Sequence, residues 1–272
     1  MKILILGYKG MLGNELVNVF KEDHELILRD KNQIDISKKE EVIEKVGALK
    51  PDIVINAAAY TAVDDAESNK DLAYQINGCA VGFLAAVCKE INALLIHFST
   101  DYVFDGENHL GYKENHPYKP LNMYGKSKAL GEKLILDIKP KYYLIRTSWL
   151  FGKRGKNFVE TMLRLADEDK DIKVVNDQFG SPTYAKDLAE KVKELIESHK
   201  PSGIYHITNL GVCSWYEFAL KIFELAKLKP NVKPVKSEEF PTPAKRPTYS
   251  MLVNTKLSPM RKWEEALEDY LK

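Results

Sequence analysis

The stretch KILILGYKGMLGNELVNVF, residues 2–20, joins an apolar run to a helical pattern through three closely spaced glycines. The run over Lys2–Gly7 predicts a buried strand, and Leu12, Leu16 and Phe20 recur at the spacing of one helix face. Glycines at such a junction permit a tight turn, and the helix N-terminus that follows offers N–H groups and a positive dipole to an anion. The residues predicted to bind phosphate here are Gly7, Gly10, Met11, Leu12 and Gly13.

The first half of the chain repeats this alternation. Four further apolar runs predict strands, at Glu25–Leu28, Asp52–Ala57, Leu94–Ser99 and Tyr142–Thr147. Helical patterns separate them, and Ser37 with Glu40 predicts a capped helix start. Strands that alternate with helices form right-handed crossovers and a parallel sheet covered on both faces. The predicted fold is therefore α/β, a doubly wound parallel sheet of the Rossmann-like type.

After Trp149 the pattern changes. Helices are expected over Asn157–Asp167, Asp187–Ser198 and Ser214–Leu225, and Ile204–Thr208 predicts a late strand that rejoins the main sheet. We predict a dinucleotide-binding domain over residues 1–150, rejoined by about 184–210, and a smaller C-terminal α/β substrate domain from residues 151–183 and 211–272. Residues 230–247 hold five of the 12 prolines, which fits either a covering loop or a linker.

Composition narrows the class of function. The 272 residues include 40 Lys and Arg against 39 Asp and Glu, so the net charge of +1 gives no global field for nucleic acid or an anionic membrane. We expect no membrane helix, because no apolar stretch approaches the required length of about 20 residues. Three well-separated cysteines without a CxxC pair favour a reducing, cytoplasmic setting. A small-molecule partner is therefore expected.

Two further segments extend the dinucleotide prediction. Asp30 ends the second strand, where an acid can bind an adenosine ribose 2′-OH, while the adjacent Arg29 could instead meet a 2′-phosphate. NADH and NADPH therefore both remain open, and a solvated charge pair at the strand end is the alternative interpretation of these two residues. Small side chains after the third strand would let the backbone lie against the cofactor, at Ala57, Ala58, Ala59, Tyr60 and Thr61.

Tyr124 and Lys128 form the candidate reactive pair. Their i, i+4 spacing places both on one helix face, with Lys126 roughly opposite. A lysine ammonium within about 4–6 Å can lower the pKa of a tyrosine by ~1–3 units, which predicts a phenol able to exchange a proton with a carbinol or carbonyl oxygen. Thr100, at the end of the fourth strand, could donate a hydrogen bond to the same oxygen. An amphipathic surface helix is the alternative interpretation.

The chain resembles the extended short-chain dehydrogenase/reductase superfamily, whose Ser/Thr–Tyr–Lys triad Thr100, Tyr124 and Lys128 match in order and spacing. Its GxxGxxG turn also has the form associated with short-chain dehydrogenases. Over nearly its full length it is similar to the dTDP-4-dehydrorhamnose reductases, the family that completes dTDP-L-rhamnose synthesis. The blocks that carry this resemblance are Asn56–Ala59, Thr61–Asp64, His97–Phe104, Tyr124–Lys128, Arg146–Trp149, Asn176–Thr183, Pro241–Ala244 and Arg246–Pro247.

The resemblance implies that NADPH or NADH gives a hydride to C4 of a nucleotide-linked 4-keto sugar while Tyr124 donates the proton. Related 4,6-dehydratases carry Asp-Glu after the threonine, whereas this chain has Asp101-Tyr102, which favours reduction without elimination. Asp35 and Ile36 are implied at the adenine. The implied substrate contacts are Val63, Thr100, Asp101, Tyr102, Trp149, Asn176 and Arg246.

The chain departs from the family pattern at two places. Tyr60 stands where the family usually has histidine beside the cofactor. Bacterial members often hold magnesium at a dimer interface, and Glu15 matches one ligand without a clear counterpart for another, so magnesium and a homodimer stay open. Two alternatives to this reductase also remain: a non-catalytic regulatory subunit resembling the methionine adenosyltransferase β subunit, and a reductase or epimerase of another nucleotide sugar.

Overall fold

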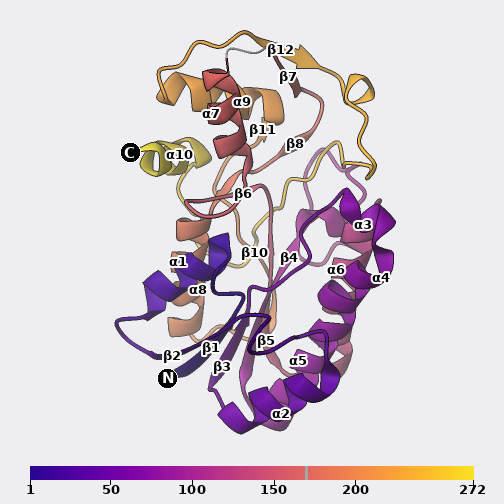
Figure 1. Ribbon diagram of the computed structural model, residues 1–272, viewed down its shortest axis with the longest axis vertical. Helices are drawn as coiled ribbons and strands as arrows, with labels where there is room; N and C mark the ends of the chain where they lie inside the picture. Colours follow the sequence, from indigo (N-terminus) through magenta and orange to yellow (C-terminus); the bar gives the residue numbers. More distant parts are fainter. Residues whose placement is uncertain (169–170) are drawn as a thin grey trace.

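The computed structural model describes residues 1–168 and 171–272, and a six-stranded parallel sheet lies at its centre (Figure 1). The strands are β1 (Lys2–Leu6), β2 (Glu25–Arg29), β3 (Ile53–Asn56), β4 (Leu94–Thr100), β5 (Lys141–Thr147) and β10 (Gly203–His206). Their order is β10-β5-β4-β3-β1-β2. The five strands predicted in the first half and the late strand that rejoins the sheet are confirmed, and with them the Rossmann-like fold.

The strand order reverses between β1 and β3. From β1 the chain moves outward to β2 and then returns to the other side, where β3, β4 and β5 follow one another. In sheets of this kind ligands bind outside the carboxyl ends of the strands at such a switch point. The turn after β1 and the segment after β3 flank this position.

Helices cover both faces of the sheet (Figure 1). Along β1 the side chains alternate, so that Ile3 and Ile5 pack with α1 (Met11–Phe20) and α8 (Ala185–Glu197), while Leu4 and Leu6 pack with α2 (Lys39–Leu49) and α5 (Ala80–Glu90). All four side chains are almost fully buried, and burial of each contributes about 1.5–3 kcal/mol. Helix α6 (Met123–Ile138) lies beside α5 on the second face.

The start of α2 differs from the prediction. The helix begins at Lys39 after Lys38, whose side chain makes no capping bond. The hydroxyl of Ser37 instead donates to Asp35 at 2.7 Å. The predicted cap by Ser37 is therefore wrong, because a nearer carboxylate takes the hydroxyl.

The continuous helical run from Lys70 to Glu90 is apolar over a greater length than was recognised from the sequence, although it does not overturn the expectation of no membrane helix. It comprises α4 (Lys70–Tyr74), the π-turn η1 (Gln75–Cys79) and α5, and by length and composition alone it could cross a membrane. However, 56% of its most apolar window is buried inside the protein. A Cβ on Gly78 would lie 2.6 Å from Leu130 of α6, so the two helices pack closely. We interpret the run as a core helix.

The C-terminal lobe has a core of its own, seen at the top of Figure 1. Its helices are α7 (Phe158–Asp167), α9 (Trp215–Leu225) and α10 (Trp263–Leu271). Short strands pair beside them: β6 (Leu150–Phe151) with β9 (Thr183–Tyr184), β7 (Ile172–Val175) with β12 (Val232–Val235), and β8 (Phe179–Gly180) with β11 (Cys213–Ser214). The remaining short helices are α3 (Asp65–Ser68), η2 (Asp101–Val103) and η3 (Ser237–Glu239).

The proline-rich segment is an ordered strap between the lobes. It contributes β12 to the upper lobe and then returns to the lower one, where the Lys245 carbonyl accepts from Asn122 at 2.9 Å. The N–H of Ala244 donates to Asp64 at 3.1 Å. Of the two interpretations given for residues 230–247, a covering segment fits these contacts.

Candidate active site

A cleft of about 530 Å³ opens at the carboxyl edge of the sheet, between the turn after β1, the ends of β3, β4 and β5, and α6. It brings together most of the residues that the sequence singles out. Those that line it are Gly10, Met11, Leu12, Gly13, Ala57, Ala58, Ala59, Thr61, Thr100, Asp101, Tyr124, Lys128 and Trp149.

The glycine turn has the shape that an anion site needs. A Cβ on Gly13 would lie 2.2 Å from the carbonyl oxygen of Gly7, and Gly7 itself has a φ of +76°. These two glycines are therefore required by the backbone packing of the turn. The first N–H groups of a helix have no intrahelical acceptor. At the start of α1 no side chain caps them, and Gly10 to Gly13 line the cleft. A dinucleotide pyrophosphate fits this position.

The N-terminus of α6 carries the reactive pair into the cleft. The side chain of Asn122 caps the helix by accepting from the N–H of Gly125 at 2.8 Å. A Cβ on Gly125 would lie 2.1 Å from the Tyr102 carbonyl oxygen, so glycine lets the helix start lie directly against the chain that follows β4. Tyr124 and Lys128 line the cleft, and the Lys128 ammonium donates to the Phe98 carbonyl at 2.9 Å.

The pKa values of this pair differ from the prediction. Burial raises the pKa of Tyr124 above its usual value of 10, the charge of Asp101 acts in the same direction, and a hydrogen bond with Thr100 opposes both. The predicted lowering beside Lys128 is wrong, because burial dominates and the ammonium is directed to the Phe98 carbonyl. Burial also lowers the pKa of Lys128 to about 8. At neutral pH the phenol therefore holds its proton and the ammonium its charge.

Buried polar atoms lie on residues that line the same cleft at the strand ends. The Thr100 hydroxyl donates to Oδ1 of Asp101 at 2.8 Å. Oδ2 of Asp101 and Oγ1 of Thr147 are buried and have no hydrogen-bond partner among the described residues. Burial raises the pKa of Asp101 to about 6, although Ser250 and Thr100 oppose the rise. Such unpaired buried groups indicate that a polar ligand completes the site.

Trp149 forms the wall of the cleft on the side of the C-terminal lobe. Its φ of +48° is uncommon for a residue with a side chain. The indole stacks on Trp215 of α9, with 3.5 Å between ring centroids and an interplanar angle of 5°. On another side a Cβ on Gly180 would lie only 2.6 Å from the ring. The C-terminal lobe thus fixes the position of a large aromatic surface in the cleft.

Nine predicted residues do not line this cleft, although several lie on segments beside it: Gly7, Asp30, Asp35, Ile36, Tyr60, Val63, Tyr102, Asn176 and Arg246. Asp30 forms an ion pair with Lys9 of the glycine turn. The backbone N–H of Tyr60 donates to Asn77, and Ile36 is buried. The ring of Tyr102 packs edge-on against Tyr124, at 5.8 Å between centroids.

The polar residues implied for the nucleotide diphosphate lie near the strap. Arg246 forms an ion pair with Asp64 at 2.7 Å and donates to the Ala244 carbonyl at 3.0 Å. Asp64 thus holds both the guanidinium and the Ala244 N–H of the strap. Oδ1 of Asn176 is buried without a hydrogen-bond partner among the described residues.

Eight residues that line the cleft were not predicted from the sequence: Asn56, Phe98, Ser99, Thr147, Ser148, Leu150, Gly155 and Lys156. The first four stand at the carboxyl ends of β3, β4 and β5. The rule that ligands bind at this edge could have identified them, since the strands themselves were predicted. Lys156 comes from the loop before α7, and no sequence pattern links that loop to the site.

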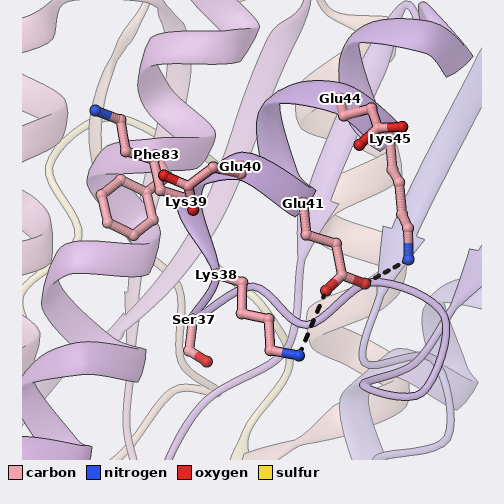
Figure 2. A pocket seen from close by; sticks show the side chains of 8 residues that line it. All are labelled: Ser37, Lys38, Lys39, Glu40, Glu41, Glu44, Lys45 and Phe83. Atoms are coloured by element: carbon pink, nitrogen blue, oxygen red, sulfur yellow. Dashed lines mark hydrogen bonds and ion pairs between the residues drawn. The ribbon is translucent and has the colours of Figure 1, made fainter.

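A larger hollow, of about 740 Å³, lies at the start of α2. Figure 2 shows its lining of exposed charged side chains, in which Lys38 and Lys45 both pair with Glu41. These three charges pair with one another at the protein surface, and we interpret the hollow as a solvated helix face. Across residues 1–168 and 171–272, no group of three or more His, Cys, Asp or Glu side chains is arranged to hold a metal ion.

The comparisons with known proteins agree with this geometry. The family model described as the RmlD substrate binding domain matches residues 1–272. The chain belongs to this family. Within it, the chain is 45% identical to the spore coat polysaccharide biosynthesis protein SpsK of Bacillus subtilis, over 99% of this chain and 96% of that protein.

Several relatives carry the name of an enzyme. The chain is 40% identical to the dTDP-4-dehydrorhamnose reductase of Burkholderia thailandensis, over 94% of this chain and 92% of that protein. It also matches the crystal structure of dTDP-4-dehydrorhamnose reductase from Bacillus anthracis in complex with NADP. That match has a TM-score of 0.96 and 43% identity and covers 99% of this chain and 98% of the other. The family resemblance inferred from the sequence is confirmed.

Proposed function

We propose that this chain is an NAD(P)H-dependent reductase that converts the C4 ketone of dTDP-4-dehydro-L-rhamnose to the alcohol of dTDP-L-rhamnose. The observation that carries the proposal is the meeting of Tyr124, Lys128 and Thr100 with the glycine turn in one cleft. The names of the RmlD relatives support the same reaction. Reduced nicotinamide, when bound, supplies the hydride.

The chain's own residues then hold the substrate and move a proton. Tyr124 donates the phenol proton to the C4 oxygen as the alkoxide forms. Its raised pKa suits this direction of reaction, because the proton donor must be protonated before each turnover. The Lys128 ammonium lies one helical turn away, where it stabilises the phenolate that remains. Thr100 orients the ketone when its hydroxyl turns from Oδ1 of Asp101 to donate to the same oxygen.

The residue after Asp101 supports reduction without loss of water. Elimination of water requires a base at the position that Tyr102 occupies in this chain. Burial and the nearby charge of Asp101 raise the pKa of the Tyr102 phenol, so it stays protonated and cannot act as that base. The ring instead packs against Tyr124.

The ion pair between Lys9 and Asp30 supports use of NADPH as well as NADH. An isolated carboxylate at Asp30 would repel a ribose 2′-phosphate. Lys9 neutralises it and holds the pKa of that carboxyl below its usual value. Arg29, whose guanidinium donates to the neighbouring Leu28 carbonyl, is a second cation at this strand end. The relative crystallised with NADP fits this proposal.

The two lobes divide the work in this proposal. Residues 1–150, rejoined by 184–210, hold the dinucleotide, and residues 151–183 and 211–272 contact the sugar nucleotide. Proposed contacts are Val63, Asp101, Tyr102 and Trp149 toward the sugar, with Asn176 and Arg246 toward the diphosphate. To bind the diphosphate, the Arg246 guanidinium would have to break its ion pair with Asp64. We propose a cytoplasmic setting, which suits three free thiols.

The test measures NADPH oxidation by the purified protein in the presence of dTDP-4-dehydro-L-rhamnose. The loss of NADPH absorbance reports the reaction. We expect turnover and an equivalent amount of dTDP-L-rhamnose by mass and NMR. UDP- and GDP-linked 4-keto sugars serve as control substrates and identify the base preference. No turnover with any of them, although NADPH binds in the cleft, would contradict the reductase and favour a non-catalytic role.

A further inference from the structure

A buried ion pair lies beneath the reactive residues. Glu132 of α6 is 0% exposed and Arg146 of β5 is 1% exposed. Nε of Arg146 donates to both carboxylate oxygens at 3.1 Å, and Nη2 donates to one of them at 2.6 Å. Replacement of such a pair by apolar residues is often neutral or stabilising, so stability alone is a weak reason for a protein to hold one.

The position of Glu132 connects this pair to the active site. Tyr124, Lys128 and Glu132 follow at intervals of four along α6 and so share one face of the helix. The Ser99 hydroxyl donates to the Glu132 carboxylate. Ser99 is also the register partner of Arg146 in the pairing of β4 with β5. Glu132 therefore fixes α6 to both strands directly below Thr100.

We propose that Glu132 is a positioning residue for the reduction, because it holds the helix that carries Tyr124 and keeps the Lys128 ammonium charged beside the phenol. This inference rests on the proposed function of the cleft. Arg146 and Ser99 act by fixing the carboxylate in place, and none of the three touches the substrate in this proposal.

The charged and titratable groups around Lys128 support this role. On α6 it has Tyr124 one turn before it and Glu132 one turn after it. His97 of β4 interacts with its charge, Asp101 lines the same cleft, and Arg146 of β5 pairs with Glu132. Burial and the charge of Lys128 hold the pKa of His97 well below its usual value, so the imidazole is neutral.

Among these groups Glu132 is the one that favours the charged form of the ammonium. Burial lowers the pKa of Lys128 to about 8, and the Glu132 carboxylate opposes that fall. An opposite charge within about 4–6 Å shifts a pKa by ~1–3 units, and Glu132 stands one helical turn from Lys128 on α6. Without the carboxylate, the pKa of Lys128 would fall further, and more of the protein would carry a neutral amine at Lys128.

The test measures the Lys128 titration directly. In protein labelled with ¹³C-lysine, the side-chain resonance of Lys128 is assigned by its loss in Lys128→Met and followed against pH without ligands. Glu132→Gln should lower the pKa of Lys128 by about one unit or more. Asp137→Asn makes the same chemical change at an exposed position of α6 and should leave it unchanged. The alkaline limb of the turnover profile should move with the resonance.

Glu132→Gln leaves a buried guanidinium without its partner, so this variant can fail to fold. The double variant Glu132→Gln/Arg146→Met removes both charges and avoids the unpaired guanidinium. It should still lower the Lys128 pKa, but by less, because a neighbouring positive charge is removed as well. Ser99→Ala keeps both charges and should leave that pKa close to the wild-type value while reducing turnover. A folded variant that lacks the Glu132 charge but titrates Lys128 as the wild type does overturns the inference. Because the titration needs no substrate, a failure of the reductase proposal is recognised separately, by wild-type protein that does not turn over.

Discussion

Replacement of Lys128 by methionine should make the protein more stable and abolish efficient turnover. The Lys128 pKa falls from 10.5 to about 8 on folding because its ammonium is buried. At 1.36 kcal/mol per pKa unit, this fall corresponds to a cost of about 3 kcal/mol at neutral pH. Methionine has a similar shape and no charge. It loses the hydrogen bond to the Phe98 carbonyl, worth about 1 kcal/mol. We therefore expect a net gain of about 2 kcal/mol in the free energy of unfolding.

The pH dependence has a definite sign. Between about pH 8 and pH 10.5 the unfolded chain keeps the proton on Lys128 while the folded protein releases it. The free energy of unfolding of the wild type therefore rises with pH across this window, relative to that of the variant. The stability that burial of the Lys128 ammonium costs is fully regained above the pKa of lysine in the unfolded chain. It is lost again as the pH falls through the pKa of Lys128 in the folded protein. The advantage of Lys128→Met should be largest at neutral pH and close to zero by about pH 9.5.

Urea unfolding at pH 7 and at about pH 9.5 measures both effects. Lys126→Met serves as the control, since this lysine is exposed on the opposite face of the same helix and its replacement should change the stability little at either pH. If Lys128→Met unfolds more easily than the wild type at neutral pH while the control does not, burial of the ammonium is not a cost. The assigned pKa would then be wrong.

Five further outcomes are expected. Tyr124→Phe should lower turnover by ~10²–10⁴ with NADPH affinity nearly intact, as stopped-flow kinetics and fluorescence titration would show; unchanged turnover would remove the phenol from the reaction. Gly13→Ala should destabilise the fold by about 3 kcal/mol or more, because its Cβ would lie 2.2 Å from a backbone carbonyl. Gly10→Ala should destabilise the fold less, because its Cβ would lie 3.3 Å from the Gly7 carbonyl oxygen, and it should weaken NADPH binding by roughly tenfold, because the methyl group enters the proposed pyrophosphate space; equal affinity would contradict the turn assignment. Lys9→Ala should weaken NADPH more than NADH in calorimetric titrations, and an equal loss for both would refute its proposed role. Trp215→Ala should raise the KM for the sugar nucleotide and change the near-ultraviolet circular dichroism of the stacked indoles, with little effect on NADPH affinity.

Local patterns predicted the parts of this protein that depend on local rules. The run from Ile3 to Leu6 alternates between two cores, and each of its residues is apolar because both faces of the sheet are covered. The i, i+4 spacing of Tyr124 and Lys128 was sufficient to place both on one face of a helix, and the strand order brings that helix to the cleft. Such inferences need only the periods of helices and strands.

Properties that depend on tertiary surroundings could not be predicted in the same way. The sequence offers a lysine to lower the pKa of Tyr124, but it does not show that burial and Asp101 act more strongly in the opposite direction. The stacking of Trp149 on Trp215 joins residues 66 positions apart, and no period connects them. The ion pair of Arg246 with Asp64 likewise depends on how the strap crosses between the lobes.

The buried pair of Tyr124 and Lys128 makes opposite demands on its surroundings. Low polarity keeps the phenol protonated, which a proton donor requires, but it also favours a neutral lysine, which could not stabilise the phenolate. A fixed carboxylate on the far side of the lysine resolves this conflict, because it favours the ammonium while lying two helical turns from the phenol. Glu132 has this position, and Arg146 and Ser99 satisfy its oxygens where water cannot. The site thus combines a strongly held proton with a charged neighbour, although burial acts against the charge.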